Sequence, residues 1–160
     1  MIKIDPFHQS DLAIVIQYVE AIQEFERIHV PELKSGREIG SDYASMLIKR
    51  AAERNGCILM AKAETVTVGF GCAWVQSDND MLLRDDARTH AYVSDIFVED
   101  AWRRQGIALQ ILSALETEMR SRGCRRIRIC SKATNQVALG CYNEAGYRPY
   151  EIAFTKDLDI

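Results

Sequence analysis

A short stretch near residue 100 carries residue types that can hold a diphosphate. Residues 98–108 read VEDAWRRQGIA and pass from an apolar, strand-like segment into a helical pattern. The free N–H groups and positive dipole of a helix start favour phosphate groups, and the small residues Gly106 and Ala108 let the backbone approach a ligand closely. Arg103 and Arg104 add two cations beside this point. The stretch therefore favours a diphosphate site, with a solvated basic turn as the alternative.

A second group of residues, further along the chain, could supply a proton donor. Asn135 is a good N-cap residue, and Ala138, Tyr142 and Ala145 recur at a spacing that places them on one face of the helix that follows. A phenol hydroxyl on a small, apolar helix face can act as an acid. A core tyrosine whose hydroxyl reaches the surface would give the same pattern.

The first third of the chain predicts one short strand and two helices. The strand stops at Pro6, and Ser10 is expected to cap a helix that runs to about Glu26. Periodicity fails between residues 27 and 40, which we interpret as a loop, and a second helix follows until Asn55-Gly56.

The rest of the chain predicts a meander followed by a crossover. Expected strands cover 57–63, 65–76, 90–98, 125–131 and about 147–154, and expected helices cover 106–122 and 135–145. Three successive strands with short links predict an antiparallel meander. A strand, helix, strand order implies a right-handed parallel connection, so the sheet should be mixed. The predicted class is α+β (mixed α/β) in a single domain covering residues 1–160.

Composition narrows the class of protein. The chain has 160 residues, 20 Lys plus Arg and 23 Asp plus Glu, which is not the balance of a dedicated nucleic-acid-binding protein. No apolar run approaches the roughly 20 residues of a membrane span. The 5 cysteines include no C-x-x-C pair, and the 3 histidines have no metal-ligand spacing. We expect a cytoplasmic protein with no metal, no nucleic-acid partner and no membrane partner.

Together, the two motifs resemble the GNAT superfamily of acyl-CoA-dependent N-acyltransferases. Arg103 to Ala108 matches R-x-x-G-x-A, and Asn135 to Tyr147 matches N-x-x-A-x-x-x-Y-x-x-x-G-Y. The resemblance implies a mixed, mostly antiparallel sheet of six to seven strands with about four helices. It also implies an acetyl-CoA-dependent N-acetyltransferase, with acetyl-CoA as co-substrate.

The resemblance assigns residues to the cofactor. It implies that the backbone of Ile96, Phe97 and Val98 holds the pantetheine arm where the fourth and fifth strands splay apart, and that Asn135 bonds the same arm. The pyrophosphate would be bound by the loop and helix start that contain Arg103, Arg104, Gln105, Gly106, Ile107, Ala108 and Leu109. Ala108 departs from the glycine of many relatives, and this variant is sterically modest.

The reaction requires an acid and a base. An ammonium group must lose a proton before it can attack a thioester, and the leaving thiolate must gain one. The resemblance makes Tyr142 the general acid. Asp95 and Glu99 are the carboxylates in the adjacent strand, sharing a face unless a bulge intervenes. We favour Asp95 acting through water; a surface carboxylate or an arginine-paired one is the alternative. A backbone N–H at Phe97 or Val98 would stabilise the oxyanion.

The acceptor is predicted from charge. The segments expected to shape its site are rich in carboxylates, which would concentrate cationic amines unless nearby cations neutralise them: Glu24, Glu26, Glu32, Asp42, Asp78, Asp80, Asp85 and Asp86. A small cationic amine is the first choice. A protein lysine or amino terminus, or a non-catalytic acyl-CoA-binding module, is the alternative. The resemblance also suggests a homodimer.

Overall fold

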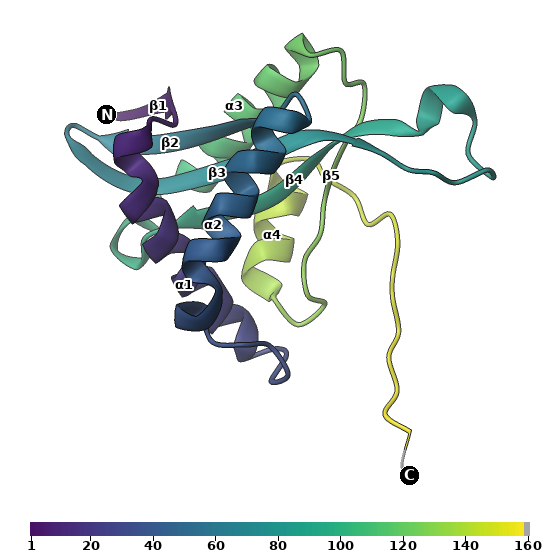
Figure 1. Ribbon diagram of the computed structural model, residues 1–160, viewed down its shortest axis with the longest axis horizontal. Coiled ribbons are helices and arrows are strands. Elements are labelled where there is room, and N and C mark those ends of the chain that lie inside the picture. The colour runs from purple at the N-terminus through teal and green to yellow at the C-terminus, as the bar shows by residue number, and fades with distance from the viewer. Residues whose placement is uncertain (159–160) are drawn as a thin grey trace.

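The computed structural model describes residues 1–158, which form one five-stranded mixed sheet (Figure 1). Its order is β1-β2-β3-β4-β5, with antiparallel pairs from β1 to β4 and a parallel β4–β5 pair. The strands are β1 (Ile2–Pro6), β2 (Cys57–Ala63), β3 (Val66–Ser77), β4 (Thr89–Val98) and β5 (Ile127–Ile129). The predicted meander and parallel crossover are confirmed.

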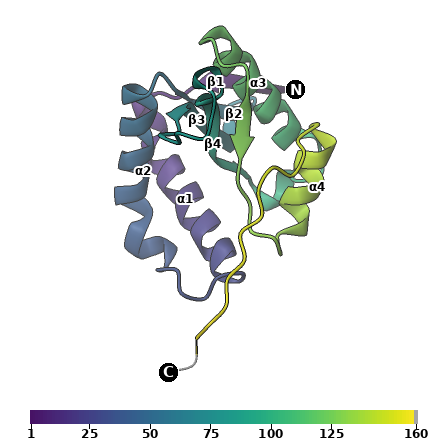
Figure 2. The same ribbon diagram turned by 90° about the vertical axis from the view of Figure 1, so that its right-hand side faces the viewer.

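Helices cover both faces of the sheet, as Figure 2 shows from its edge. They are α1 (Leu12–Arg27), α2 (Gly36–Glu53), α3 (Ile107–Ser121) and α4 (Gln136–Glu144). One buried core joins α1 and α2 to the sheet around Phe70 and Trp74, and a second joins α3 to the other face around Val93 and Ile111. None of the helices in residues 1–158 combines the length and apolar character needed to cross a membrane.

The second helix begins earlier than the sequence pattern predicted. Ser35 and Glu38 form a capping box, in which the Glu38 N–H donates to Ser35 Oγ and the Ser35 N–H donates to Glu38 Oε2. At Gly36, an added Cβ would lie 2.3 Å from the backbone oxygen of Glu20, so only glycine lets α2 approach α1 this closely. The loop predicted for residues 27–40 is therefore shorter and ends at the capping box.

The cap of α1 also differs from the prediction. Residues Gln9–Asp11 form a short 3-10 turn, and Asp11 rather than Ser10 occupies the N-cap position. The Asp11 carboxylate accepts a hydrogen bond from the His8 N–H and lies 3.5 Å from Lys62 Nζ. Asp11 thus joins the start of α1 to β2.

A bulge interrupts β4 next to its partner β3. Cys72 pairs with Asp95, but the following Ala73 pairs with Val93, so Ser94 is an extra residue on β4. A bulge bends its strand and increases the local twist. The bulge lies before Asp95, so from Asp95 onward the side chains of β4 alternate regularly between the two faces of the sheet.

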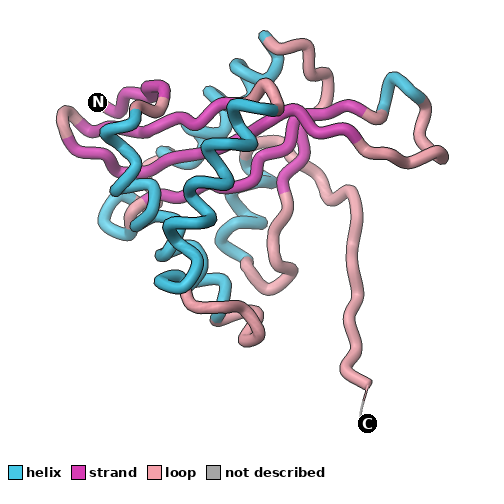
Figure 3. The backbone as a smooth tube through the Cα atoms, viewed as in Figure 1, coloured by secondary structure: helices cyan, strands magenta, loops and turns pink. Residues whose placement is uncertain are grey.

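The strand predicted around residues 147–154 is absent. The chain leaves α4 and continues as an extended segment without strand pairing (Figure 3). Residues 1–158 therefore contain five strands rather than the expected six to seven, although the α+β class and the four helices agree with the prediction. A period-two pattern specifies a strand's faces, but forming the strand also requires a neighbouring edge.

Candidate active site

A gap opens between β4 and β5 where the bulge bends β4. The two strands pair only through residues 91–93 and 127–129. Beyond this point, within residues 1–158, no strand pairs with the β5-facing edge of residues 94–98. Unpaired N–H and C=O groups along a strand can bind an extended ligand as a further strand would. The gap therefore coincides with the backbone of Ile96, Phe97 and Val98, the residues predicted to hold the pantetheine arm.

The start of α3 lies at the end of the connection that leaves β4. Arg104 and Gly106 both have positive φ angles, 59° and 74°, and the first backbone bond of this helix runs from the Gln110 N–H to the Gly106 oxygen. The N–H groups of Ile107, Ala108 and Leu109 consequently lack helical acceptors. An added Cβ on Gly106 would meet no atom within 4 Å, so open space faces this turn. Such a concave turn of N–H groups suits an anion.

The two predicted cations are placed differently from each other. Arg103 donates from Nε to the Val98 oxygen at 3.0 Å, pairs with Asp100 at 2.7 Å, and lies over the Phe97 ring. Its side chain therefore holds the end of β4. Arg104 is exposed, and no ion pair or hydrogen bond engages its side chain in the described part of the chain. Of the two arginines, Arg104 is the one that can swing toward a ligand.

Asp95 is a buried carboxylate, with 8% of the residue exposed. The hydroxyl of Tyr43, on α2, lies 3.3 Å from Oδ1 and 3.2 Å from Oδ2. Burial raises the pKa of Asp95 to about 6, against the lowering effect of hydrogen bonds from Ser94 and Tyr43, and the charge of Glu26 contributes to the increase. A carboxyl group with this pKa suits general-base chemistry near neutral pH.

Glu99 shares the face of Asp95 but has a different partner. The hydroxyl of Tyr18 donates to Glu99 Oε1 at 2.8 Å, and also lies 2.8 Å from the oxygen of Thr67. Tyr18 is itself buried among Phe70 and other core residues. Glu99 is therefore held by Tyr18 on α1, whereas Asp95 faces Tyr43 on α2.

Tyr142 lies on α4, which Asn135 caps as predicted. The Ala138 N–H donates to Asn135 Oδ1 at 3.1 Å, and this bond leaves the Asn135 amide N–H groups available to a ligand. Burial raises the pKa of Tyr142 above its usual value, with further contributions from the charges of Glu26 and Asp95. The phenol therefore stays protonated, and the charge of the predicted base acts on it.

Glu26, at the end of α1, is the carboxylate of the predicted acceptor region that reaches this group. It is half-buried, and its charge contributes to raising the pKa values of Asp95, Tyr142 and Tyr92. The loop after it contacts the segment before α4, where Thr134 Oγ1 lies 2.7 Å from His29 Nδ1. These contacts bring the α1–α2 connection to the open end of the gap.

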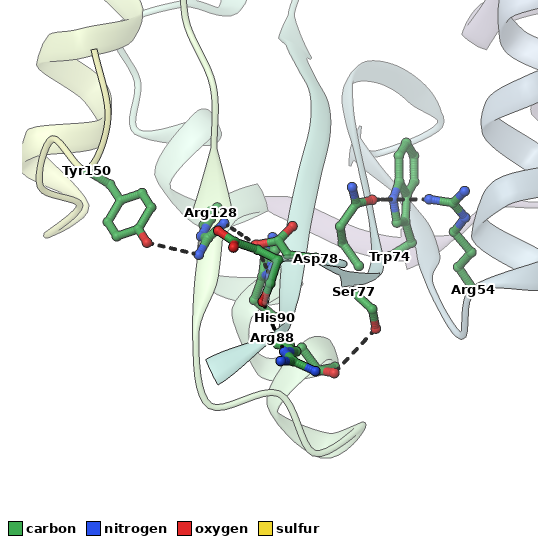
Figure 4. Close-up of polar contacts among 11 residues, drawn as sticks. Arg54, Trp74, Ser77, Asp78, Arg88, His90, Arg128 and Tyr150 are labelled. Carbon is green, nitrogen blue, oxygen red and sulfur yellow. Dashed lines mark hydrogen bonds and ion pairs between the residues drawn. The ribbon is translucent and has the colours of Figure 1, made fainter. Parts of the chain in front are cut away.

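Several other predicted acidic residues are engaged elsewhere. Glu24 accepts from the Gly36 N–H. In the β3–β4 connection, Asp85 pairs with Arg88 and Asp86 with Arg84, while Asp78 pairs with Arg128 on β5 (Figure 4). That connection begins at Ser77, which pairs with Thr89 at the start of β4. Six residues of strand, about 20 Å, separate Thr89 from Asp95. The structure does not bring these acids to the site.

Tyr43 and Tyr92 are site residues that the sequence did not single out. Tyr43 had only the pattern of a core-facing residue on a helix, and its partner lies 52 positions away. Tyr92 points to the same face as Asp95 because the bulge absorbs Ser94 between them. The possibility of a bulge was the sole sequence signal for this grouping.

Solved structures with the same architecture include known acyltransferases. An aminoglycoside N-acetyltransferase, AAC(6')-Iy, has been solved with CoA and with the bisubstrate analogue CoA-S-monomethyl-acetylneamine. It is 16% identical, with a TM-score of 0.73, and the match to the CoA complex covers 100% of this chain and 96% of that one. The 6'-N-acetyltransferase AAC(6')-Ih from Acinetobacter baumannii is 17% identical, with a TM-score of 0.68 and coverage of 100% and 99%.

A third similar structure is a tetramutant of the BH1408 protein from Bacillus halodurans, at 16% identity, a TM-score of 0.82 and coverage of 98% and 99%. These likenesses establish the fold. The family itself is established by a sequence-family model described as the acetyltransferase (GNAT) family, which matches residues 22–147. That range contains the splayed strands, the start of α3 and the helix of Tyr142, so the chain belongs to the GNAT family of acetyltransferases.

Proposed function

We propose that this GNAT-family protein transfers an acetyl group from acetyl-CoA to the primary amine of a small cationic acceptor, by direct attack in a ternary complex. The observation that carries the proposal is the convergence of Glu26, Tyr43, Asp95 and Tyr142, from four different elements, beside the gap between β4 and β5. We further propose that residues 1–160 act as a single acetyltransferase domain.

The cofactor is proposed to bind along β4 and α3. The open edge of β4 at Ile96, Phe97 and Val98 supplies hydrogen-bonding groups to the pantetheine arm, apart from the Val98 oxygen, which accepts from Arg103. The Asn135 amide adds another donor. The N–H groups from Arg104 to Leu109 face the pyrophosphate, with Arg104 free to add charge. The Gln105 side chain donates to the Ala101 oxygen, which steadies this loop. Arg103 acts indirectly by holding the end of β4.

Asp95 is proposed to take the proton of the amine, through water. Moving a proton from an ammonium group with a pKa of about 10.4 to an ordinary aspartate costs about 9 kcal/mol. With the pKa of Asp95 at about 6, the same transfer costs about 6 kcal/mol. A turnover of about 10 s⁻¹ corresponds to a barrier of roughly 16 kcal/mol, so this step fits within it.

Tyr142 is proposed to donate to the sulfur as the carbon–sulfur bond breaks. Its raised pKa keeps the phenol protonated at neutral pH, as an acid must be. The same burial also raises the pKa of the leaving thiol, which offsets the weaker acidity of the buried phenol. A backbone N–H at Phe97 or Val98 faces the oxyanion in this arrangement.

The proposed acceptor class rests on Glu26 and the tyrosines. The half-buried Glu26 carboxylate, whose charge acts on Tyr92, Asp95 and Tyr142, attracts a cation, and the faces of aromatic rings add to this attraction. Aminoglycosides, the acceptors named for two of the similar structures, carry several amino groups and belong to this chemical class. The cytoplasm is the proposed location, supported by five free cysteines, which suit a reducing compartment.

The proposal is tested by incubating the protein with acetyl-CoA and matched amines. The panel pairs each diamine or aminoglycoside with a neutral primary amine of similar size, and adds peptides with a free lysine or amino terminus. Product mass identifies the acetylated compound. Thiol release is read against an enzyme-only blank, because Cys130 is exposed and reacts with thiol reagents.

We expect turnover to favour the cationic amines, and Glu26→Gln to raise their KM about tenfold with little effect on neutral amines. If only the peptides were acetylated, the acceptor would be a protein lysine or amino terminus rather than a small cationic amine. Tight acetyl-CoA binding without any product would favour a binding module.

A further inference from the structure

The stretch of residues 131–147 is weakly attached to the rest of the protein. It contains α4, which has no fully buried residue and contributes no side chain to either core. Within residues 1–158, the backbone hydrogen bonds of this stretch all stay inside it. Elements with few buried apolar contacts have low local stability. The position of α4, and with it the positions of Asn135 and Tyr142, therefore depends on a few side-chain contacts.

Side chains hold this stretch at its two ends. After α4, burial and the charge of Glu116 on α3 raise the pKa of Tyr147, so Tyr147 lies beside α3. Before α4, Thr134 Oγ1 lies 2.7 Å from His29 Nδ1, just beyond the end of α1. This contact, the latch, is the one hydrogen bond in the described part of the chain that joins residues 131–147 to α1, α2 or their connection.

His29 is held in place by the end of α1. The Glu26 oxygen accepts from the His29 N–H at 2.9 Å, and the Phe25 ring packs edge-on against the imidazole, with 5.3 Å between the ring centres. Both residues lie one helical turn before His29 and thus on the same side of the chain. A threonine hydroxyl can donate or accept, so the bond to Thr134 forms whether His29 is neutral or protonated.

The latch lies between the two proposed ligand sites. On one side, Glu26 is the carboxylate proposed to attract the amine, and its backbone oxygen holds His29. On the other side, Thr134 directly precedes Asn135, which caps α4 and is proposed to bind the pantetheine arm. A ligand that orders one side of such a link lowers the cost of ordering the other side. Coupling of this kind is reciprocal between the two ligands.

We propose that His29 and Thr134 are positioning residues. Their hydrogen bond holds the N-terminal end of α4 against the α1–α2 connection, so that binding of acetyl-CoA also orders the acceptor side of the site. The inference rests on the proposed function, in which Asn135 binds the cofactor and residues 27–35 do not. The start of the stretch can stay fixed while α4 adjusts, because Arg128 on β5 pairs with Asp78 at 2.7 Å (Figure 4).

Hydrogen exchange with CoA as the probe tests the latch without an acceptor and without turnover. In the wild type, CoA should slow amide exchange in α4 and also in residues 27–35, where the His29 and Val30 N–H groups are hydrogen-bonded. Thr134→Val keeps the shape of the side chain and removes its hydroxyl. This variant should keep the effect of CoA on α4 and lose the effect on residues 27–35. Its Kd for CoA should rise about fivefold, because one neutral hydrogen bond is lost.

Three further variants separate the latch from a general loss of structure. Thr134→Ser retains the hydroxyl and should behave like the wild type. Thr117→Val is the matched control and should also behave like the wild type, since its lost hydroxyl bonds only the Ser113 oxygen within α3. His29→Phe keeps a ring against Phe25 and should reproduce Thr134→Val. Combining these two changes should cause no further loss, because both remove the same bond. Circular dichroism checks that each variant is folded.

The outcomes distinguish the latch from the proposed function. If CoA protects α4 but not residues 27–35 in the wild type, the latch is overturned and the proposed cofactor site stands. The latch is also overturned if Thr134→Val keeps the protection of residues 27–35 or the wild-type affinity for CoA, or if Thr134→Ser or Thr117→Val loses that protection. If the folded wild type does not bind CoA at all, the proposed function and the latch are overturned together.

Discussion

The hydroxyl of Tyr43 lies 3.2 and 3.3 Å from the two carboxylate oxygens of Asp95, so one phenolic proton is shared between them. These distances exceed the roughly 2.7 Å of a strong O–H···O bond. The contact connects α2 to β4 and orients the carboxylate without neutralising it. Burial is consequently the dominant effect on its pKa.

The first prediction concerns pH. Only the carboxylate form of Asp95 accepts a proton, so kcat/KM for the acceptor should rise with pH through an apparent pKa of about 6. Asp95→Asn should lower turnover by about 10²-fold or more and remove this limb of the profile. Initial rates from pH 5 to 9 check both. Retention of the same limb in Asp95→Asn would show that another group is the base.

The second prediction concerns stability and has the opposite sign. Because the folded-state pKa of Asp95 is raised from 3.8 to about 6, the folded state holds a proton that the unfolded state releases. The contribution of Asp95 to stability is therefore fully present below about pH 4 and lost as pH rises through about 6. Asp95→Asn carries no such charge and should be more stable than wild type at pH 8, by up to about 3 kcal/mol.

Denaturant unfolding of both proteins at pH 4 and pH 8 measures this difference. The advantage of Asp95→Asn should shrink at pH 4, where the carboxyl is protonated in the folded state and partly protonated in the unfolded state. An unchanged difference between the two pH values would mean that Asp95 is not held at a raised pKa.

The third prediction is that Tyr142→Phe lowers kcat by about 10²-fold or more, while the affinity for acetyl-CoA changes little. The phenylalanine ring keeps the packing of α4 and removes only the hydroxyl group. Tyr147→Phe is the matched control, since Tyr147 follows α4 closely and its ring lies 6.2 Å from that of Tyr142. Equal kcat in wild type and Tyr142→Phe, in an assay limited by chemistry, would remove the general-acid role.

The fourth prediction separates cofactor binding from backbone strain. Gly106 and Gly123 flank α3, both have positive φ angles (74° and 85°), and at neither would an added Cβ meet an atom within 4 Å. Replacing either by Ala should cost about 1–2 kcal/mol of stability. Only Gly106→Ala should also weaken acetyl-CoA binding, by about tenfold, because it distorts the proposed pyrophosphate turn.

Calorimetric titration with CoA and thermal unfolding of the two variants measure both effects. A similar loss of CoA affinity in Gly123→Ala would point to general destabilisation. Normal affinity in Gly106→Ala would place the pyrophosphate elsewhere.

The sequence predicted best what is encoded locally. The turn from Arg103 to Ala108 and the capped helix of Tyr142 depend on residues within a few positions of one another, and both lie where the pattern put them. The meander and the crossover likewise follow from neighbouring elements.

Features that depend on distant contacts could not be predicted in the same way. Tyr43 joins the site through a residue 52 positions away, and α2 starts early because Gly36 packs on Glu20. The expected final strand does not form within residues 1–158, although β5 has an open edge there. In each case the structure of a segment depends on a residue or strand far away in the sequence, which the pattern of the segment itself does not reveal.

The bulge at Ser94 has a consequence for how such a site can arise. Because the extra residue is absorbed opposite Cys72 and Ala73, Val93 and Asp95 lie on opposite faces of the sheet, as adjacent residues would in a regular strand without Ser94. A single inserted codon in an ordinary antiparallel strand would therefore bend it away from β5 and leave both layers of helices packed as before. A one-residue insertion is thus enough to open a strand edge for a long, flexible ligand while the two buried cores keep their packing.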